Sequence, residues 1–216
     1  MNLLKRLRSN RKLISRSENL NFTLQKRPGI YRIDTQKCYT IDLKKEEREE
    51  LKGFCQTFYY MEKVLTSGIL EVKNNTGYII RKLTFDDFLK GDASYFTKIK
   101  LADIKKRLID KTYIPYGIVI NNKLAYSAWI SLDKLPYNFE LKLNEDEGAL
   151  LDDYCMPEFR RRGLHSYVLN FRLNQLYKYG KKRSIVVILT SNYPALKAET
   201  KVGFKTKKKF IIFKIF

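Results

Sequence analysis

The sequence predicts an α/β fold organised around a mixed β-sheet. One observation is a strand–helix–strand unit at about residues 148–156, 163–179 and 184–190, which implies a right-handed crossover between parallel strands. Another is a hairpin at residues 116–130 that is closed by an Asn-Asn pair, because asparagine tolerates the positive φ of tight hairpin turns. The third is a hydrophobic content of 44% in 216 residues, which is typical of a globular chain long enough for one well-packed domain and an extension.

The net charge of +20 is the strongest compositional signal. It reflects 43 lysines and arginines against 23 acidic residues. Such a charge suits nucleic acid, an anionic membrane surface or a phosphorylated substrate. A general drift toward lysine explains it equally well, since lysines are spread over most of the chain.

Cysteine usage and hydropathy predict the compartment. Cys38, Cys55 and Cys155 include no C-x-x-C pair, so neither a disulfide framework nor a zinc site is expected. This favours a reducing compartment, here the cytoplasm. No apolar run approaches the roughly 18 to 20 residues of a membrane span, and the start of the sequence does not have the pattern of a secretory signal.

Residues 1–27 are predicted to form a basic N-terminal arm. They carry eight lysines and arginines against the single acid Glu18, a net charge of +7. Their apolar spacing is that of a short, imperfect amphipathic helix, so binding to an anionic membrane surface is one interpretation. A solvated or loosely docked arm is the favoured one. The arm has no nucleic-acid-binding motif or aromatic platform, so nucleic acid is the less favoured partner.

Residues 28–76 are predicted to be a strand–helix extension packed on the core. Two short strands at residues 30–34 and 38–43 precede a helix at residues 46–65 with apolar side chains on one face. The Asn-Asn-Thr-Gly turn that follows is the predicted boundary with the core, residues 77–216. No chemistry is assigned to the extension.

The core begins with a predicted strand at residues 78–84, followed by a short helix capped by Thr84 and a second helix at residues 102–108. The apolar strand at residues 184–190 is typical of a parallel strand covered on both faces, and a last strand covers residues 207–216. An acidic neighbourhood lies between the hairpin and the crossover and consists of Glu140, Glu145, Asp146, Glu147, Asp152 and Asp153.

The stretch from Asp152 to Leu169 is predicted to carry the chemistry. A strand ends at Pro157, because proline has no amide hydrogen for a central ladder. Three arginines at residues 160–162 and then Gly163 lead into an amphipathic helix. A basic glycine turn at the start of a helix is an anion cradle, because free backbone N–H groups converge there and the helix dipole favours negative charge.

Arg160-x-x-Gly163-x-His165, preceded by a Pro-Glu-Phe segment, resembles the acyl-CoA signature of the GNAT superfamily of N-acyltransferases. A second landmark, Asn-Tyr-Pro-Ala and then Val-Gly-Phe within residues 192–204, resembles the helix after the family's fifth core strand. The resemblance implies a single GNAT-like domain. Its central sheet would be mixed and mostly antiparallel, with a splayed parallel pair in the middle and flanking helices. His165 departs from the family, which has Gly or Ala there, and adds bulk beside the expected pyrophosphate.

The resemblance also implies acetyl-CoA as co-substrate and no metal. The arginine turn and the first helical residues would bind the pyrophosphate, the strand end would pair with the pantetheine arm, and an asparagine would contact the cofactor. These predicted cofactor-binding residues are Asp153, Tyr154, Cys155, Arg160, Arg161, Arg162, Gly163, Leu164, His165, Ser166 and Asn192. The alternatives are a surface charge run for the arginines and a turn or cap role for Asn192.

Asp152, Asp153 and Glu199 are the predicted catalytic residues. Asp152 is the first choice for the base, because apolar neighbours along the strand disfavour a charged carboxylate and make it a stronger proton acceptor. Many family members have an acid at this position, and Asp153 is the second choice. Many members also place a tyrosine as general acid seven residues after the cofactor-contacting asparagine. Glu199 stands there in this chain, with Tyr154 and Tyr193 as substitutes.

The sequence therefore predicts an acyl-CoA-dependent N-acyltransferase that transfers acetyl from acetyl-CoA to a primary amine of a small acceptor, such as an amino sugar. One alternative is a catalytically weak GNAT-like protein that binds nucleic acid or an anionic membrane surface, as His165 and the missing tyrosine would favour. A transferase with another acyl donor is a second. A nucleophilic Cys155 activated by His165 is the least favoured. The oligomeric state stays open.

Overall fold

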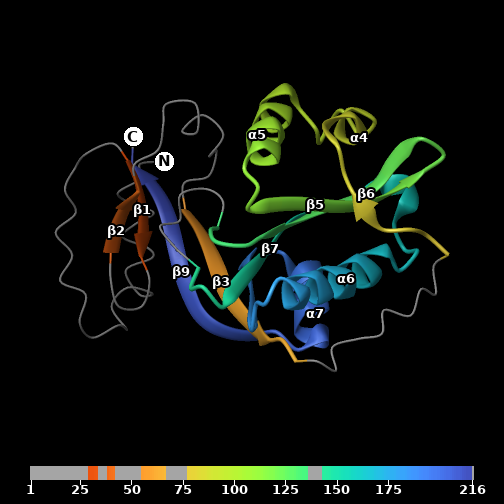
Figure 1. Cartoon of the computed structure of the whole chain (residues 1–216). Coiled ribbons are helices and arrows are strands. Elements are labelled where there is room, and N and C mark those ends of the chain that lie inside the picture. Colours follow the sequence, from red (N-terminus) through yellow and green to blue (C-terminus); the bar gives the residue numbers. More distant parts are fainter. Residues whose placement is uncertain (1–28, 34–37, 42–54, 67–76, 136–142, 216) are drawn as a thin grey trace. The chain divides into compact units, whose positions relative to one another are not determined.

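The computed structural model describes residues 29–33, 38–41, 55–66, 77–135 and 143–215 (Figure 1). Two compact units emerge: one is Tyr59–Lys207, and the other combines the chain up to Phe58 with Lys208–Phe216. The predicted arm lies outside the described residues, and the boundary predicted at residue 76 adjoins another stretch outside them. Both therefore stay predictions.

The unit Tyr59–Lys207 contains β8, β7, β6, β5 and β4, most of β3 and the first residues of β9, in a mixed sheet with the strand order β9-β3-β8-β7-β6-β5-β4. Strands β4 to β7 pair antiparallel in succession, whereas β7 and β8 are parallel. This confirms the predicted α/β fold with a parallel pair inside a mostly antiparallel sheet. The strands are β3 (Cys55–Val64), β4 (Arg81–Lys82), β5 (Tyr113–Ile120), β6 (Lys123–Ser131), β7 (Glu147–Cys155), β8 (Arg183–Leu189) and β9 (Lys205–Ile215).

Two short strands belong to the other unit. They are β1 (Gly29–Ile33) and β2 (Cys38–Ile41), which pair antiparallel with each other. β1 also pairs antiparallel with the end of β9. The strands predicted at residues 30–34 and 38–43 are thereby confirmed to within two residues at each end.

The helix predicted at residues 46–65 is wrong over its second half, which forms β3; residues 42–54 lie outside the described chain. Side chains spaced by four share one face in a helix and in a strand, so the spacing of Met61 and Leu65 did not discriminate between them. Both side chains are buried, whereas Val64 is exposed. The aromatic run Phe58-Tyr59-Tyr60 favours a strand, and neighbouring strands on both sides satisfy its backbone. The strand predicted at residues 78–84 is reduced to the two residues of β4.

Turn and cap residues mark the starts of the helices. Helix α4 (Phe85–Leu89) follows Thr84 as predicted, whereas the helix predicted at residues 102–108 begins four residues earlier, at Lys98. Thr97 caps this helix, α5 (Lys98–Ile109). Asn121 and Asn122 have φ values of 48° and 61° and close the β5–β6 hairpin. The remaining helices are α6 (Leu164–Lys178) and α7 (Tyr193–Val202). Among the described helices, none combines the length and the apolar character needed to cross a membrane.

The helices pack on both sides of the sheet within this unit. Figure 1 shows α4 and α5 on one side of β5 and β6, and α6 on the other. The core under α6 consists of leucines on one helical face, which pack with side chains from β3, β5, β6, β7 and β8. Those leucines are Leu169, Leu173 and Leu176, each 0% exposed. The strand–helix–strand crossover is confirmed.

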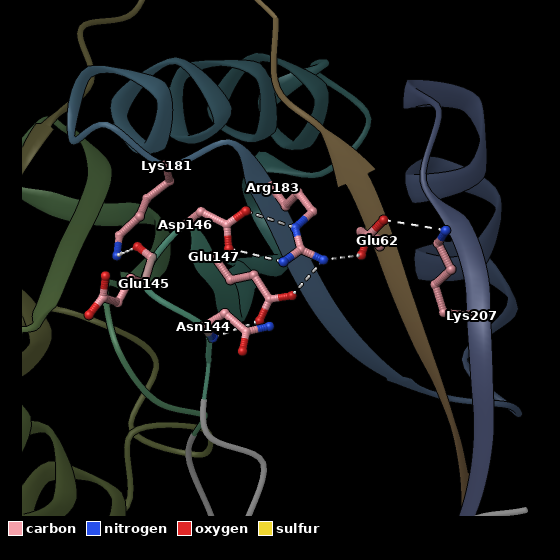
Figure 2. Close-up of polar contacts among 8 residues, drawn as sticks. All are labelled: Glu62, Asn144, Glu145, Asp146, Glu147, Lys181, Arg183 and Lys207. Atoms are coloured by element: carbon pink, nitrogen blue, oxygen red, sulfur yellow. Dashed lines mark hydrogen bonds and ion pairs between the residues drawn. The ribbon is translucent and has the colours of Figure 1, made fainter.

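Ion pairs close one end of the parallel pair (Figure 2). Arg183, at the start of β8, pairs with Asp146 at 3.0 Å and with Glu147 at 3.1 Å. It also reaches Glu62 of β3 at 3.2 Å, and Glu62 lies 3.4 Å from Lys207 of β9. Two residues of the acidic neighbourhood predicted from the sequence, Asp146 and Glu147, therefore form ion pairs at this end of the sheet. Glu140 lies outside the described residues.

Candidate functional site

Strands β7 and β8 separate beyond the end that Arg183 closes. Within the described chain their parallel pairing extends from Glu147 with Arg183 to Ala149 with Ile185, although both strands continue. This is the splayed parallel pair that the sequence resemblance implied. Beyond Ala149 and Ile185 no ladder joins the facing edges of the two strands in the described chain, so their backbone groups suit a ligand that can form backbone hydrogen bonds.

A β-bulge lies in the separated part of β7. Ser127 faces Tyr154 and Trp129 faces Leu151, so that Asp152 and Asp153 together stand opposite one residue of β6. Two residues against one is the pattern of a bulge, and Asp152 has a φ of 47°. As a result the two aspartates contact different helices, α5 and α6.

Asp152 does not have the apolar surroundings that the sequence predicted. Its carboxylate forms an ion pair of 2.5 Å with Arg107, which comes from α5 and is itself buried. Arg107 also pairs with Asp103 at 2.7 Å. The neighbours of Asp152 along its own strand were apolar, but packing of α5 brought a cation from 45 residues away. Its assignment as the base stays a prediction, now for a carboxylate that already has a partner.

Asp153 is the centre of a polar cluster, defined here as Tyr126, Asp153, His165, Arg172 and Glu199, in which Tyr126, Arg172 and Glu199 are buried while Asp153 and His165 are partly accessible to solvent. Arg172 of α6 is 0% exposed and donates to Asp153 Oδ1 at 2.6 Å. The same guanidinium donates to the carbonyls of Trp129 and Leu151, at 3.1 and 3.5 Å. The guanidinium therefore contacts both strands at the bulge, β6 and β7.

Glu199 contributes an acid from α7. It is 2% exposed, and burial, with Asp153 adding to it, raises its pKa to about 8, while Arg172 opposes the rise. Its carboxyl group is therefore mostly protonated at neutral pH. Its Oε2 atom is buried without a hydrogen-bond partner among the described residues. A buried carboxyl group that keeps its proton at neutral pH can act as a proton donor.

Arg172 and Tyr126 were not among the residues predicted from the sequence. The signal for Arg172 was present, because it occupies the i+3 position of the apolar face between Leu169 and Leu173. A charged residue on such a face is buried only when it is paired. Tyr126 had no comparable signal, since a tyrosine within an apolar strand is ordinary core.

The arginine–glycine turn has the geometry of the predicted anion cradle. Pro157 opens a short 3-10 turn (Pro157–Phe159), and Gly163, with a φ of 75°, precedes the first residue of α6 without offering a side-chain cap. A Cβ atom added at Gly163 would meet nothing within 4 Å. The amides of the first helical turn, which include those of Leu164, His165 and Ser166, have no acceptor within the helix. The cradle is thus open.

The three arginines of the turn are all exposed. Arg160 Nε donates to the carbonyl of Cys155 at 3.2 Å, and Arg162 donates to that of Glu158 at 3.1 Å. Arg161 has a φ of 63°. Two of the arginines therefore shape the turn, and all three place positive charge around it.

The sequence led us to expect the side chain of His165 inside the cradle, beside the pyrophosphate. In the structure the side chain lies outside the cradle. Its ring turns inward, where Nδ1 lies 2.7 Å from the hydroxyl of Tyr126 and 3.8 Å from Asp153 Oδ1. Burial lowers the pKa of His165 below its ordinary value, with Arg172 contributing and Asp153 opposing. The imidazole is therefore neutral at physiological pH.

Tyr154 and Cys155 complete the end of β7. Tyr154 stacks on Tyr95 with ring centroids 3.5 Å apart and donates to Asp92 at 2.7 Å. Burial raises the pKa of the Cys155 thiol. Because a thiolate is the reactive form, this disfavours the nucleophilic cysteine considered above.

Asn192 caps α7. Its Oδ1 atom accepts from the amide of Ala195 at 3.3 Å, which is the capping role that the sequence left as an alternative. The next residue, Tyr193, is 75% exposed. Contact of Asn192 with a cofactor stays a prediction. Across the part of the chain that is described, no group of three or more His, Cys, Asp or Glu side chains could hold a metal ion.

No family model and no curated protein matches the sequence, but solved structures match in fold. An acetyltransferase from the GNAT family of Colwellia psychrerythraea is 17% identical, with a TM-score of 0.52 over 76% of this chain and 57% of its own. A GNAT-family protein of Novosphingobium aromaticivorans is 13% identical, with a TM-score of 0.50 over 74% of this chain and 65% of its own. A Staphylococcus epidermidis protein of unknown function is 12% identical, with a TM-score of 0.56 over 98% and 79%.

These likenesses define a class by fold. The protein is an α/β protein whose parallel pair splays beside a helix that begins at an exposed arginine–glycine turn. Its fold is that of the GNAT superfamily, as the sequence motifs predicted. The chain spans less than two thirds of the length of the two GNAT structures, 65% and 57%.

Proposed function

We propose that this protein is an acyl-CoA-dependent N-acetyltransferase that transfers acetyl from acetyl-CoA to a primary amine of a small acceptor. The observation that carries the proposal is the succession of the β7 bulge, the arginine turn at residues 160–162 and the open start of α6 at Gly163. An anionic ligand with a long polar arm suits such a site.

The proposed binding mode divides acetyl-CoA between two regions. The pyrophosphate would lie on the amides of the first turn of α6, where the helix dipole and Arg160 to Arg162 favour negative charge. The pantetheine arm would follow the open edge of β7 and pair with the backbone of Asp153 to Cys155. This would bring the thioester to the bulge, where a backbone N–H can meet the oxyanion that develops on its carbonyl.

The proposed chemistry is a direct transfer. The amine nitrogen attacks the thioester carbon, a C–N bond forms, and the C–S bond breaks. Asp152 or Asp153 takes the first proton of the ammonium, directly or through water, and the second proton, which the nitrogen loses as the amide forms, returns to Glu199 once that residue has protonated the thiolate. Glu199 gives its proton to the departing thiolate, because its pKa of about 8 is close to the roughly 8.5 of an ordinary thiol and near the operating pH.

Thermal unfolding in the presence of acetyl-CoA tests the proposal. A ligand that binds the native state raises the melting temperature, so acetyl-CoA should stabilise the full chain. Gly163→Asp should abolish the shift, because it adds bulk and negative charge inside the cradle.

Gly180→Asp is the matched control. Gly180 lies beyond the other end of α6, has a φ of 77° like the 75° of Gly163, and is equally open. This variant should keep the full shift. An undiminished shift in Gly163→Asp would refute the cradle. No shift in the wild type, together with salt-sensitive binding to DNA or anionic vesicles, would favour the non-catalytic alternative.

The acceptor and the acyl chain are identified by turnover. Release of free thiol from acetyl-CoA would be measured with amino sugars, nucleotide-linked amino sugars, polyamines, aminoglycosides and peptide amines. Propionyl-CoA and longer donors would be compared with acetyl-CoA on the best acceptor. The proposal predicts amine-dependent thiol release, and release that does not depend on an amine would contradict it.

A further inference from the structure

The side chain of His165 has a defined tautomer. Tyr126 is buried, and its hydroxyl donates to Asp153 Oδ1 at 2.7 Å. A phenol has a single proton, so at its 2.7 Å contact with His165 Nδ1 the tyrosine oxygen must accept. Nδ1 of the neutral ring therefore carries the proton, and Nε2 has a free lone pair.

Arg172 makes this arrangement firm. The fully buried Arg172 donates to the same Asp153 oxygen at 2.6 Å, which keeps that carboxylate an acceptor toward Tyr126. The sequence of donors thus runs from His165 to Tyr126 to Asp153. Reversing it would place two acceptors or two donors face to face.

His165 Nε2 is left without a partner. The atom is buried and has no hydrogen bond to any residue of the described chain. An acceptor buried without a donor costs free energy that a bound group can recover. The missing partner must be a donor, because Nε2 is the unprotonated nitrogen.

The position of His165 indicates which donor. Its backbone lies in the first turn of α6, inside the cradle, whereas its ring lies beside Asp153 at the bulge. Under the proposed function these two places hold the opposite ends of the pantetheine arm, the pyrophosphate and the thioester. The arm between them carries secondary amides, whose N–H groups are uncharged donors.

We propose that His165 Nε2 accepts a hydrogen bond from an amide N–H of the pantetheine arm of acyl-CoA, and that Tyr126 is the positioning residue that fixes its tautomer. The inference rests on the proposed function. It gives the histidine a role in place of the small residue of the GNAT signature.

The bond depends on pH. The groups that face the ring are Tyr126 on β6, Asp153 on β7 and Arg172 on α6, and Glu199 of α7 faces the same Asp153–Arg172 pair. Protonation of Nε2 turns the acceptor into a donor. Because burial lowers the pKa of His165, affinity for the arm is retained through neutral pH and lost as the pH falls through that lowered pKa.

Calorimetric titration of the full chain with two ligands tests this. Acetyl-CoA contains the arm, whereas 3′-phospho-ADP contains the phosphates without it, so the ratio of the two affinities isolates the arm. In the wild type the ratio should be constant from pH 8 to pH 7 and fall in acid. His165→Ala should lower the ratio roughly tenfold at pH 7.5, the scale of one lost hydrogen bond to a buried acceptor.

Two further variants serve as controls. His165→Gln keeps a carbonyl acceptor near the position of Nε2, so the ratio should stay within about threefold of the wild type, the scale of a well-replaced hydrogen bond, and lose its pH dependence. Tyr126→Phe removes the oxygen that fixes the His165 tautomer. It should therefore lower the affinity ratio by an intermediate factor and change how the ratio depends on pH in acid. A purely structural role for Tyr126 would leave that profile unchanged.

The outcomes separate cleanly. If His165→Ala leaves the ratio unchanged or raises it, the histidine contributes bulk or holds only water, and the inference is overturned. If His165→Ala does not fold, a pH-independent ratio in the wild type and His165→Gln overturns it instead. A wild type that does not bind acetyl-CoA removes the proposed function, and the inference with it.

Discussion

Replacing Glu199 by Gln should make the protein more stable and less active. The substitution keeps the shape of a side chain that is 2% exposed and removes its proton equilibrium. In the folded protein the pKa of Glu199 is raised from 4.5 to about 8 by burial. The protein therefore contains a carboxyl group whose ionised form is destabilised in the folded state, which is a frequent cost of functional sites.

The size of the effect follows from linkage. Below pH 4.5 both folded and unfolded states are protonated, and the carboxyl costs nothing. Between pH 4.5 and 8 the unfolded state releases the proton while the folded state keeps it, so wild-type stability falls with rising pH. At about 1.4 kcal/mol per pH unit, the cost reaches roughly 3 kcal/mol at pH 7 and levels off above pH 8. Glu199→Gln should recover most of it.

Urea denaturation at pH 4.5, 6, 7 and 8 measures this directly. The two proteins should coincide at pH 4.5, and the variant should gain in free energy of unfolding as the pH rises. With an accepted amine, the maximal rate of the variant should fall by about 10²–10⁴, the scale of general acid catalysis. The wild type should lose rate above about pH 8, where the donor ionises. A parallel pH dependence of stability in both proteins would refute the assigned protonation state, and an unchanged rate would refute the catalytic role.

Two other predictions concern the carboxylates of β7 and the closed end of the sheet. Asp152→Asn should lower the maximal rate by about 10²–10⁴ with acetyl-CoA affinity nearly unchanged. Asp153→Asn should act mainly on stability, because it removes the charge that pairs with the buried guanidinium of Arg172. Near-normal turnover in Asp152→Asn together with a loss of turnover in Asp153→Asn would reverse the assignment of the base. Arg183→Met should cost about 3 kcal/mol of unfolding free energy, because it leaves Glu147, whose side chain is 4% exposed, without its cation. Lys181→Met, which removes an exposed bond to a carbonyl, should cost under about 0.5 kcal/mol.

Local chemistry made much of the fold predictable. The asparagines of the β5–β6 turn, Pro157 at the end of β7 and Gly163 before α6 act through their own φ angles and hydrogen-bonding groups, so their effect survives in any context. The cradle could be predicted for the same reason, because it consists of consecutive backbone amides. The misassigned β3 has the opposite cause: a spacing of four residues suits a helix and a strand equally, and only the neighbouring strands decided between them.

The sequence by itself determined the crossover, the glycine turn before α6 and, through the resemblance of its motifs, the GNAT fold, because each is signalled by residues close together in the chain. Tertiary structure alone decided the protonation and pairing of the acids. Asp152 forms an ion pair with Arg107 of α5, and Asp153 forms one with Arg172 of α6. Glu199 became a neutral acid through burial on α7. Electrostatic free energies depend on distance and on exclusion of water, and both are set by elements that the chain brings together from far apart.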